Sequence, residues 1–442
     1  MRFGGIRTRG GLSVRRRGFI ATAVGAALGS GLAASGCGVL SGKGSPTVLR
    51  LFTAELGDVL GRGSTEQYWR GLADRFHDTR PDIVIQVSSA PRQEASTTVA
   101  ELVHRGQAPD IAQLAAVADF AAGDSLYPAT ELLTVPVLSA LVPNIASAGK
   151  VQHIQYGMPI AARVGRLFYN RSLFAAAGLD PNEPPADWEA LLAAADALRE
   201  AGVPVPFGLP LGHEDAQDEA LMWILAGGGA LTDVSGGYTI NSDENVAAFH
   251  WLREELNTHG RTGAASPAET TREQLIDGFT SGSVGMLGAD NTLVWRAEAA
   301  GIAYGTAPMP GRAGPTRSAL GDATWLLGFS QSGHREEIAA FLDFVFRPPS
   351  GVASFAGRHG LLPASSPEVE ATLQGSTPHE RALGPFLTGL PTATFFPVGK
   401  ASWSIVAGSL ARGIRRVVQP GIDVRQVLDE LQREAESAEN LR

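Results

Sequence analysis

The side chains that could carry catalysis form no recognisable pattern in this chain of 442 residues. Neither H-E-x-x-H nor G-x-S-x-G occurs, so the usual patterns of a zinc protease and a serine hydrolase are absent. The nine histidines lack the spacing of metal ligands, and His213-Glu214 is expected to lie in a surface loop. Residues 42–45 resemble a phosphate loop, but Gly44 stands where Ser or Thr must hold Mg²⁺. The sequence therefore predicts no enzyme, no cofactor and no metal site.

The only cysteine, Cys37, ends a segment with the layout of a bacterial export signal. Three arginines that end at Arg17 are similar to a twin-arginine variant, and an uncharged apolar run extends from them to residue 34. Residues 34–36 resemble a lipoprotein cleavage box, with Ala34 where Leu is usual. A retained anchor is the alternative, but the run is short beside the ~20 apolar residues of a spanning helix. We predict an export signal at 1–36, lipidation of Cys37, a tether at 37–46, and anchoring on the outer face of the cytoplasmic membrane.

The composition describes an ordinary globular protein with a strongly acidic mature part. Residues 1–36 hold six of the 36 Lys and Arg and none of the 45 Asp and Glu, so 30 basic residues face 45 acidic ones beyond them, a net charge of −15. Such an excess of negative charge argues against nucleic acid as a binding partner, because binding to nucleic acid depends on neutralising phosphates. It also argues against adhesion to an anionic membrane surface. The length predicts two or three domains.

Strand and helix signals alternate along the mature chain. β-prone runs at residues 47–52, 83–87 and 108–114 enclose helical patterns at 64–76 and 98–105. This order favours a parallel sheet with crossover helices, and hence the α/β class. Further on, one helix is expected to stop at Gly178. The next is expected to begin after Asp187 and to bury a stripe formed by Trp188, Leu191, Ala195 and Leu198.

Short motifs follow one another in a consistent order along nearly all of the mature chain. They include Leu49-Arg50-Leu51-Phe52, Ala108-Pro109-Asp110-Ile111, Tyr156-Gly157-Met158-Pro159, Leu167-Phe168-Tyr169-Asn170, Pro185-Ala186-Asp187-Trp188 and Leu361-Leu362-Pro363. In their order and spacing the chain resembles the extracytoplasmic solute-binding proteins of ABC importers, in the carbohydrate-binding group that includes maltose-binding protein. Each motif is weak alone, and the shared order carries the resemblance.

The resemblance implies a two-lobed periplasmic-binding-protein fold with three crossings between the lobes, near residues 161–163, 287–290 and 348–352. The first lobe would then hold residues 47–162 and 288–350, and the second 163–287 and 351–442. The resemblance also implies a monomer that closes on a carbohydrate in the interlobe cleft. The loaded form would dock on the transmembrane subunits of an ABC permease.

Sugars present apolar ring faces, which aromatic side chains stack against, and hydroxyls, which charged and amide groups bind. On the segments that resemble the family's cleft, the side chains of these types are Phe52, Glu55, Gln113, Arg163, Trp223, Asp290, Asn291, Asp322, Trp325, Phe396 and Trp403. The chain departs from the maltose-binding pattern at Arg163, where that pattern has an acidic residue. It departs again at Asp290-Asn291, where that pattern has Gly-Pro-Trp.

Several of these aromatics also fit a packing role, Phe52 and Trp325 among them. Trp223 is assigned to ring stacking, so Trp223→Ala is expected to weaken sugar binding with little effect on the fold. If Glu55, Asp290 and Asp322 converge, the cleft would favour a cationic or amino sugar. If Arg163 dominates, it would favour a glycerophosphodiester or another phosphorylated solute.

We favour neutral or amino sugars as the ligand, because only one arginine lies among the candidate cleft residues. An exported glycoside hydrolase stays open as an alternative, since it needs only two carboxylates and the spacing selects no pair. A lipoprotein adhesin or scaffold is the other alternative.

Overall fold

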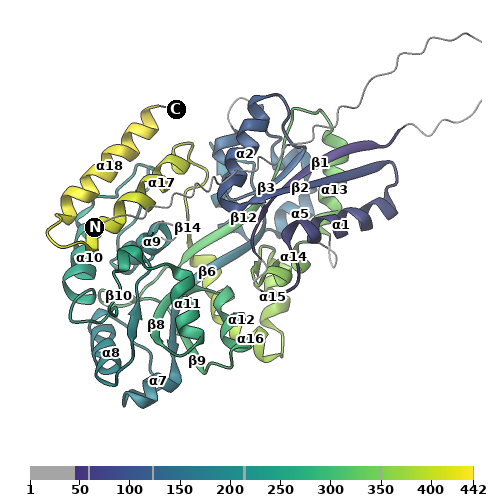
Figure 1. The fold of residues 1–442 in the computed structure, drawn as a ribbon. Coiled ribbons are helices and arrows are strands. Elements are labelled where there is room, and N and C mark those ends of the chain that lie inside the picture. The colour runs from purple at the N-terminus through teal and green to yellow at the C-terminus, as the bar shows by residue number, and fades with distance from the viewer. Residues whose placement is uncertain (1–44, 58–59, 122–123, 213–215, 348–350, 442) are drawn as a thin grey trace, which may run out of the picture. The chain divides into compact units, whose positions relative to one another are not determined.

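Two long strands, β6 (Met158–Asn170) and β12 (Leu320–Gly328), organise the fold because each changes partners along its length. The first half of β6 pairs antiparallel with β12, and its second half pairs antiparallel with β8 and β9. The second half of β12 pairs with β3, which is joined through β1 to β2. We call the elements around β1, β2 and β3 the first lobe and those around β7, β8 and β9 the second lobe. Figure 1 shows β6 and β12 running between them.

The computed structural model describes residues 45–57, 60–121, 124–212, 216–347 and 351–441. These residues fall into a single unit, Ser45–Arg442. The predicted export signal, Cys37 and the tether before residue 45 lie outside the described residues. So do residues 348–350 of the predicted third crossing.

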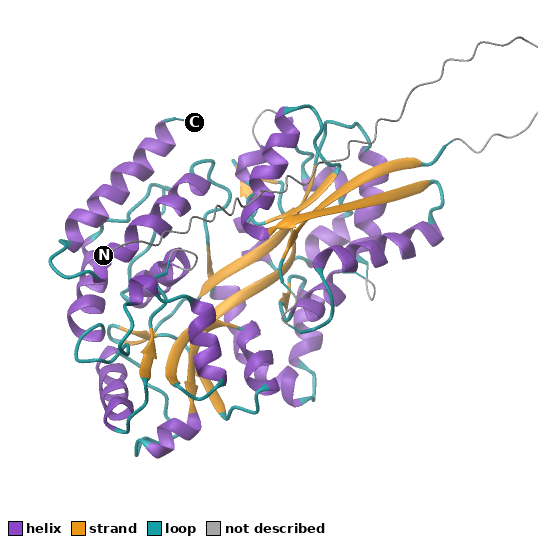
Figure 2. Cartoon of the chain, viewed as in Figure 1, coloured by secondary structure: helices purple, strands orange, loops and turns teal. Residues whose placement is uncertain are grey.

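The described strands, in chain order, are β1 (Thr47–Glu55), β2 (Ile83–Pro91), β3 (Ile111–Leu114), β4 (Lys150–Val151), β5 (Ile154–Gln155), β6, β7 (Val205–Gly208), β8 (Val284–Asp290), β9 (Tyr304–Ala307), β10 (Pro310–Gly311), β11 (Gly314–Pro315), β12, β13 (Leu362–Pro363) and β14 (Thr394–Phe395). The α-helices are α1 (Thr65–Thr79), α2 (Arg92–His104), α3 (Ala118–Ala121), α4 (Ala129–Leu132), α5 (Val135–Ala140), α6 (Pro143–Ala148), α7 (Arg171–Ala176), α8 (Trp188–Glu200), α9 (Ala216–Ala226), α10 (Asp243–Trp251), α11 (Arg272–Thr280), α12 (Thr292–Ala299), α13 (Arg335–Phe346), α14 (Val352–His359), α15 (Ser366–Leu373), α16 (Pro378–Gly389), α17 (Trp403–Gly413) and α18 (Val424–Asn440). Figure 2 shows helices packed around the strands of both lobes.

The main sheet mixes parallel and antiparallel pairs in the order β2-β1-β3-β12-β6-β8-β7. The predicted parallel arrangement of the first strands is confirmed, since β1 pairs parallel with both β2 and β3. The first predicted crossing, at residues 161–163, lies within β6.

The strand pairing favours a different second crossing from the predicted one. Residues 286–290 of β8 pair with residues 165–169 of β6, and the other edge of β8 pairs with β7. Residues 287–290 therefore sit within the second lobe. It is β12 that continues from β6 to β3, so the pairing favours a second crossing in β12, near residues 321–325.

Local capping explains several helix boundaries. The Asp187 carboxylate accepts a hydrogen bond from the Ala190 backbone N–H, which starts α8 where the sequence predicts. The predicted stripe of α8 is buried. Gly178, after α7, has φ +76°, a left-handed conformation that glycine adopts without strain.

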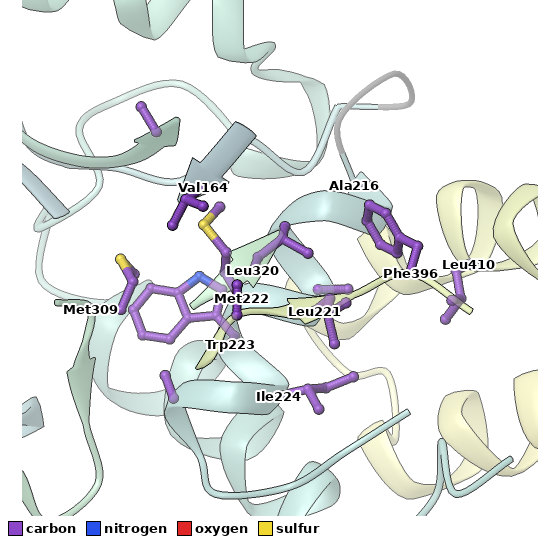
Figure 3. Close-up of a cluster of buried hydrophobic side chains, with 14 of the residues drawn as sticks. Val164, Ala216, Leu221, Met222, Trp223, Ile224, Met309, Leu320, Phe396 and Leu410 are labelled. Carbon is purple, nitrogen blue, oxygen red and sulfur yellow. The ribbon is translucent and has the colours of Figure 1, made fainter. Parts of the chain in front are cut away.

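Trp223 lies inside the second lobe and not on a surface. Its side chain is fully buried, and its indole Nε1 donates to Glu219 Oε1 at 2.7 Å. Its ring centroid lies 5.7 Å from that of Phe207 and 5.7 Å from that of Trp251. Figure 3 shows the indole surrounded by apolar side chains, Met309 among them. This position does not support the interpretation of Trp223 as a stacking surface for sugar.

Trp223→Ala is expected to lower the free energy of unfolding by about 3–5 kcal/mol, because it empties a large buried volume and removes a donor from Glu219. Chemical denaturation measures this loss. Trp223→Phe keeps an aromatic ring and serves as the matched control, with a smaller loss expected. Unchanged stability together with lost sugar binding would instead support Trp223 as a residue that contacts the sugar.

Candidate functional site

Four charged side chains meet where β6 and β12 pair, and we call them the crossing network: Arg92, Arg163, Asp290 and Asp322. Arg163 Nη2 donates to Asp322 Oδ2, and its Nη1 lies 3.4 Å from Asp290 Oδ2. Arg92 Nη2 donates to the same Asp322 oxygen at 3.1 Å. The side chains of Arg163, Asp322 and Asp290 are 22 %, 17 % and 24 % exposed, and that of Arg92 is 42 % exposed. The three predicted residues of this group, Arg163, Asp290 and Asp322, are therefore brought together.

The backbone places each member of the network. Arg163 and Asp322 are direct partners in the antiparallel register of β6 and β12, an arrangement that favours opposite charges. Asp290 ends β8 opposite Gly165, and its Oδ1 accepts from the Thr292 backbone N–H at 2.8 Å as α12 begins. Arg92 is the first residue of α2, directly after β2. The network thus combines first-lobe, second-lobe and shared elements.

Electrostatic coupling favours the ionised forms of Arg163 and Asp322. Burial lowers the pKa of Arg163, but the carboxylates of Asp322, Asp290 and Asp218 outweigh it and hold this pKa above its usual value. Burial raises the pKa of Asp322, but Arg163 and Arg92 outweigh that effect, so its pKa lies below its usual range. The positive charge of Arg163, together with burial, lowers the pKa of Arg92. An ionised network is a fixed set of strong hydrogen-bond donors and acceptors.

A small pocket, with a cavity volume of about 30 Å³, opens on the second-lobe side of this network. We call it the crossing pocket, and it is lined by Arg163, Gly165, Asp218, Met222, Arg272, Ala289, Asp290, Leu320 and Asp322. Arg272 Nη2 lies 3.0 Å from Oε2 of the fully buried Glu219. The pKa of Asp218 is raised because burial disfavours its charged form, although Arg272 opposes this effect.

A second pocket lies on the first-lobe side, lined by Ala54, Leu56, Arg92, Ala95, Ser96, Gln113, Leu114, Ala115, Ala323 and Thr324. The pair formed by Arg92 and Asp322 separates it from the crossing pocket, because each partner lines one of the two. The described linings of both pockets contain no aromatic side chain. Their chemistry is that of charges, one amide, one thioether, two hydroxyls and apolar groups.

Several predicted site residues instead form hydrogen bonds that stabilise the fold outside the crossing network. Both carboxylate oxygens of Glu55 accept backbone N–H groups at the start of α1, from Thr65 at 2.9 Å and Glu66 at 3.0 Å. The buried Asn291 accepts from the Val164 N–H at 3.1 Å and donates to the Gly360 carbonyl at 2.8 Å. Neither side chain faces a pocket described above.

Gln113 is buried and lines the first-lobe pocket, but its Oε1 already accepts from Thr53 Oγ1 at 2.6 Å and from Trp69 Nε1 at 2.8 Å. Phe52 is buried in the core. Trp325 is buried too, packed so closely against Gly149 that a Cβ there would lie 2.5 Å from its ring.

Phe396 and Trp403 stack on each other, with ring centroids 5.2 Å apart, and both are almost fully buried. Nearby, the Ala118 N–H donates to the Val398 carbonyl, and Ser404 Oγ donates to Asp119 Oδ1 at 3.0 Å. These bonds join the first-lobe helix α3 to the segment around α17. The Phe396–Trp403 pair therefore lies beside a contact between α3 and the C-terminal segment, outside both pocket linings.

Sequence reasoning missed Arg92, Asp218 and Arg272. Arg92 carries a usable signal, because it directly follows a β-strand, at the carboxyl end where open α/β sheets bind ligands. Asp218 and Arg272 lie near the starts of helices α9 and α11, and their spacing gives no sign that they share a pocket.

Two features are absent from the described part of the chain. No group of His, Cys, Asp or Glu there is arranged to hold a metal ion. Within the same residues, no helix has the length and apolar character needed to cross a membrane.

Comparison with known proteins identifies relatives by sequence and by fold. The pattern described as bacterial extracellular solute-binding protein matches residues 62–352, more than half of the chain. A Brucella abortus (strain 2308) protein described as a binding protein is 28% identical over 253 residues, which are 55% of this chain and 58% of that relative. An sn-glycerol-3-phosphate-binding periplasmic protein of Salmonella typhimurium is 26% identical over 324 residues, 68% of this chain and 72% of that one.

Among solved structures, the GacH receptor of Streptomyces glaucescens, determined unliganded and in complex with acarbose, is similar with a TM-score of 0.73. The two chains are 20% identical, and the match covers 89% of this chain and 99% of the receptor. This likeness confirms the predicted two-lobed α/β fold.

Asp322→Asn is expected to lower the free energy of unfolding by about 2–3 kcal/mol at neutral pH, because it leaves the partly buried Arg163 and the exposed Arg92 without their shared carboxylate. Asp343→Asn, in an exposed pair with Arg347, is the control and is expected to cost less than about 1 kcal/mol.

The pH dependence of the free energy of unfolding provides a second test of the contribution of Asp322. The folded-state pKa of Asp322 is depressed, so its stabilisation is complete above the unfolded-state pKa and disappears as the pH falls through the folded-state value. Wild type should therefore lose more stability than Asp322→Asn between about pH 5 and pH 2. Parallel losses in both proteins would contradict the coupling of Asp322 to the two arginines.

Proposed function

We propose that this chain, which belongs to the bacterial extracellular solute-binding protein family, captures a sugar beside the crossing network and delivers it to an ABC permease. The sugar class includes amino sugars and short oligosaccharides. The proposed action is capture and release without chemical change, in keeping with a family described by solute binding.

The crossing network is the observation that carries the proposal. It presents ionised guanidinium and carboxylate groups, and these form strong hydrogen bonds with hydroxyls. Arg92 belongs to the first lobe and Asp290 to the second, so a ligand that contacts both would favour the closed arrangement of the lobes. We place the hinge at the middle of β6 and in β12, the strands that the two lobes share.

A glycerol phosphate or glycerophosphodiester is the second candidate ligand. The Salmonella relative, which binds sn-glycerol-3-phosphate, and the presence of Arg92, Arg163 and Arg272 favour it. Each of these arginines, however, already has a carboxylate partner. A phosphate would have to compete with those carboxylates, so the sugar proposal is preferred.

A glycoside hydrolase is less well supported by Asp322, the carboxylate at the centre of the crossing network. Hydrolysis of a glycoside requires one carboxylic acid that donates a proton. Asp322, whose pKa lies below its usual range, is held as a carboxylate by two arginines.

The sugar proposal predicts thermal stabilisation without turnover. The purified chain, heated with maltose, trehalose, glucosamine, chitobiose or glycerophosphocholine, should be stabilised by at least one sugar, by about 2.7 kcal/mol at a concentration one hundred times the dissociation constant. Arg163→Ala should abolish the shift. Arg347→Ala, a change at an exposed pair, should leave it intact.

Stabilisation by glycerophosphocholine alone would replace the sugar proposal with the phosphodiester one. Release of a cleaved product, followed by chromatography of the ligand, would replace binding with hydrolysis.

We also propose that the exported chain is held on the membrane by lipid at Cys37. Cys37→Ser should shift the protein from the membrane fraction to the soluble exported fraction, because a serine cannot take the thioether-linked lipid. Immunoblots of both fractions measure the distribution. An unchanged membrane fraction would favour the retained-anchor alternative.

A further inference from the structure

Among the residues that the structure describes, the charges around the crossing pocket do not balance, and the excess charge falls on one residue. The positive groups are Arg92, Arg163 and Arg272, and the negative groups are Asp218, Glu219, Asp290 and Asp322. Each of these three arginines forms an ion pair with a carboxylate. Arg92 pairs with Asp322, Arg163 pairs with Asp322 and Asp290, and Arg272 pairs with Glu219. The fourth carboxylate remains outside these pairs.

Asp218 is that carboxylate. It is half-buried and lines the crossing pocket, and across the residues that the structure describes it makes no hydrogen bond and no ion pair. Burial of this carboxylate costs free energy that the positive charges of Arg272, Arg163 and Arg92 offset only in part. The raised pKa of Asp218 reflects this cost.

We infer that Asp218 is the contact for a cationic nitrogen on the ligand, so that the crossing pocket selects amino sugars over neutral and phosphorylated ones. This inference rests on the proposed function. A hydroxyl would give Asp218 a hydrogen bond but would leave the net negative charge buried. An ammonium supplies both the hydrogen bond and the opposite charge. A phosphate would add negative charge to a pocket that already has an excess.

The inference is tested by calorimetric titration of the full chain with matched ligands. Glucosamine and the chitosan disaccharide carry the amine, glucose lacks it, and N-acetylglucosamine and chitobiose carry it in uncharged, acetylated form. The amine ligands should bind at least about tenfold more tightly than their acetylated partners, a difference of about 1.4 kcal/mol. Their affinity should also fall on acidification, as Asp218 takes up a proton.

Asp218→Asn keeps the shape and removes the charge, so it should abolish the preference for amines while neutral sugars bind as before. Glu189→Gln removes an exposed charge on α8 and should preserve the preference. Because the ligand comparison is also made on wild type, the test does not depend on the variant folding.

The possible results distinguish a failure of this inference from a failure of the proposed sugar-binding function. Neutral sugars that bind as tightly as amines, or an Asp218→Asn protein that retains the preference, would overturn the role of Asp218 and leave the sugar receptor standing. No heat from any sugar would overturn the proposed function itself.

Discussion

The ion pair between Arg163 and Asp322 is the constraint on which the crossing region depends. Their strands, β6 and β12, are the two that both lobes share, and the residues face each other in register. A partly buried charge without its partner destabilises a fold strongly, so the pair resists any slip of one strand along the other.

The same pair determines the chemistry available to a ligand. Arg92 reaches Asp322 from α2, and Asp290 reaches Arg163 from β8, so the network extends into each lobe. Its groups are held by one another before any ligand arrives, which limits the ordering cost of binding. A solute that bonds to several of them would hold the lobes together. This arrangement gives a physical route from binding to a change that a membrane partner could detect.

Sequence predicts the class of fold and many local boundaries because their causes are local. Asp187 caps α8 through a backbone group three residues away, and the parallel β1–β2 pair follows from a strand–helix–strand order. The crossing through β12 has no such local signal, since its partners in β6 are about 160 residues away in the chain. The sequence predicts either that Glu55, Asp290 and Asp322 converge or that Arg163 dominates. It does not predict that Arg163 pairs with Asp290 and Asp322.

Residue type was a poor guide to which side chains face the pocket. Trp223 and Glu55 have the chemistry of sugar-binding groups, yet one is buried and the other holds the start of α1. Their direction depends on helix rotation and on partners that the sequence does not reveal. The central claim is that solute binds at the crossing network. The crystal structure of the full chain with its tightest-binding sugar tests this claim most directly. Sugar oxygens or nitrogens are expected within hydrogen-bond distance of Arg163 and Asp218, whereas a sugar bound away from β6 and β12 would contradict binding at the crossing network.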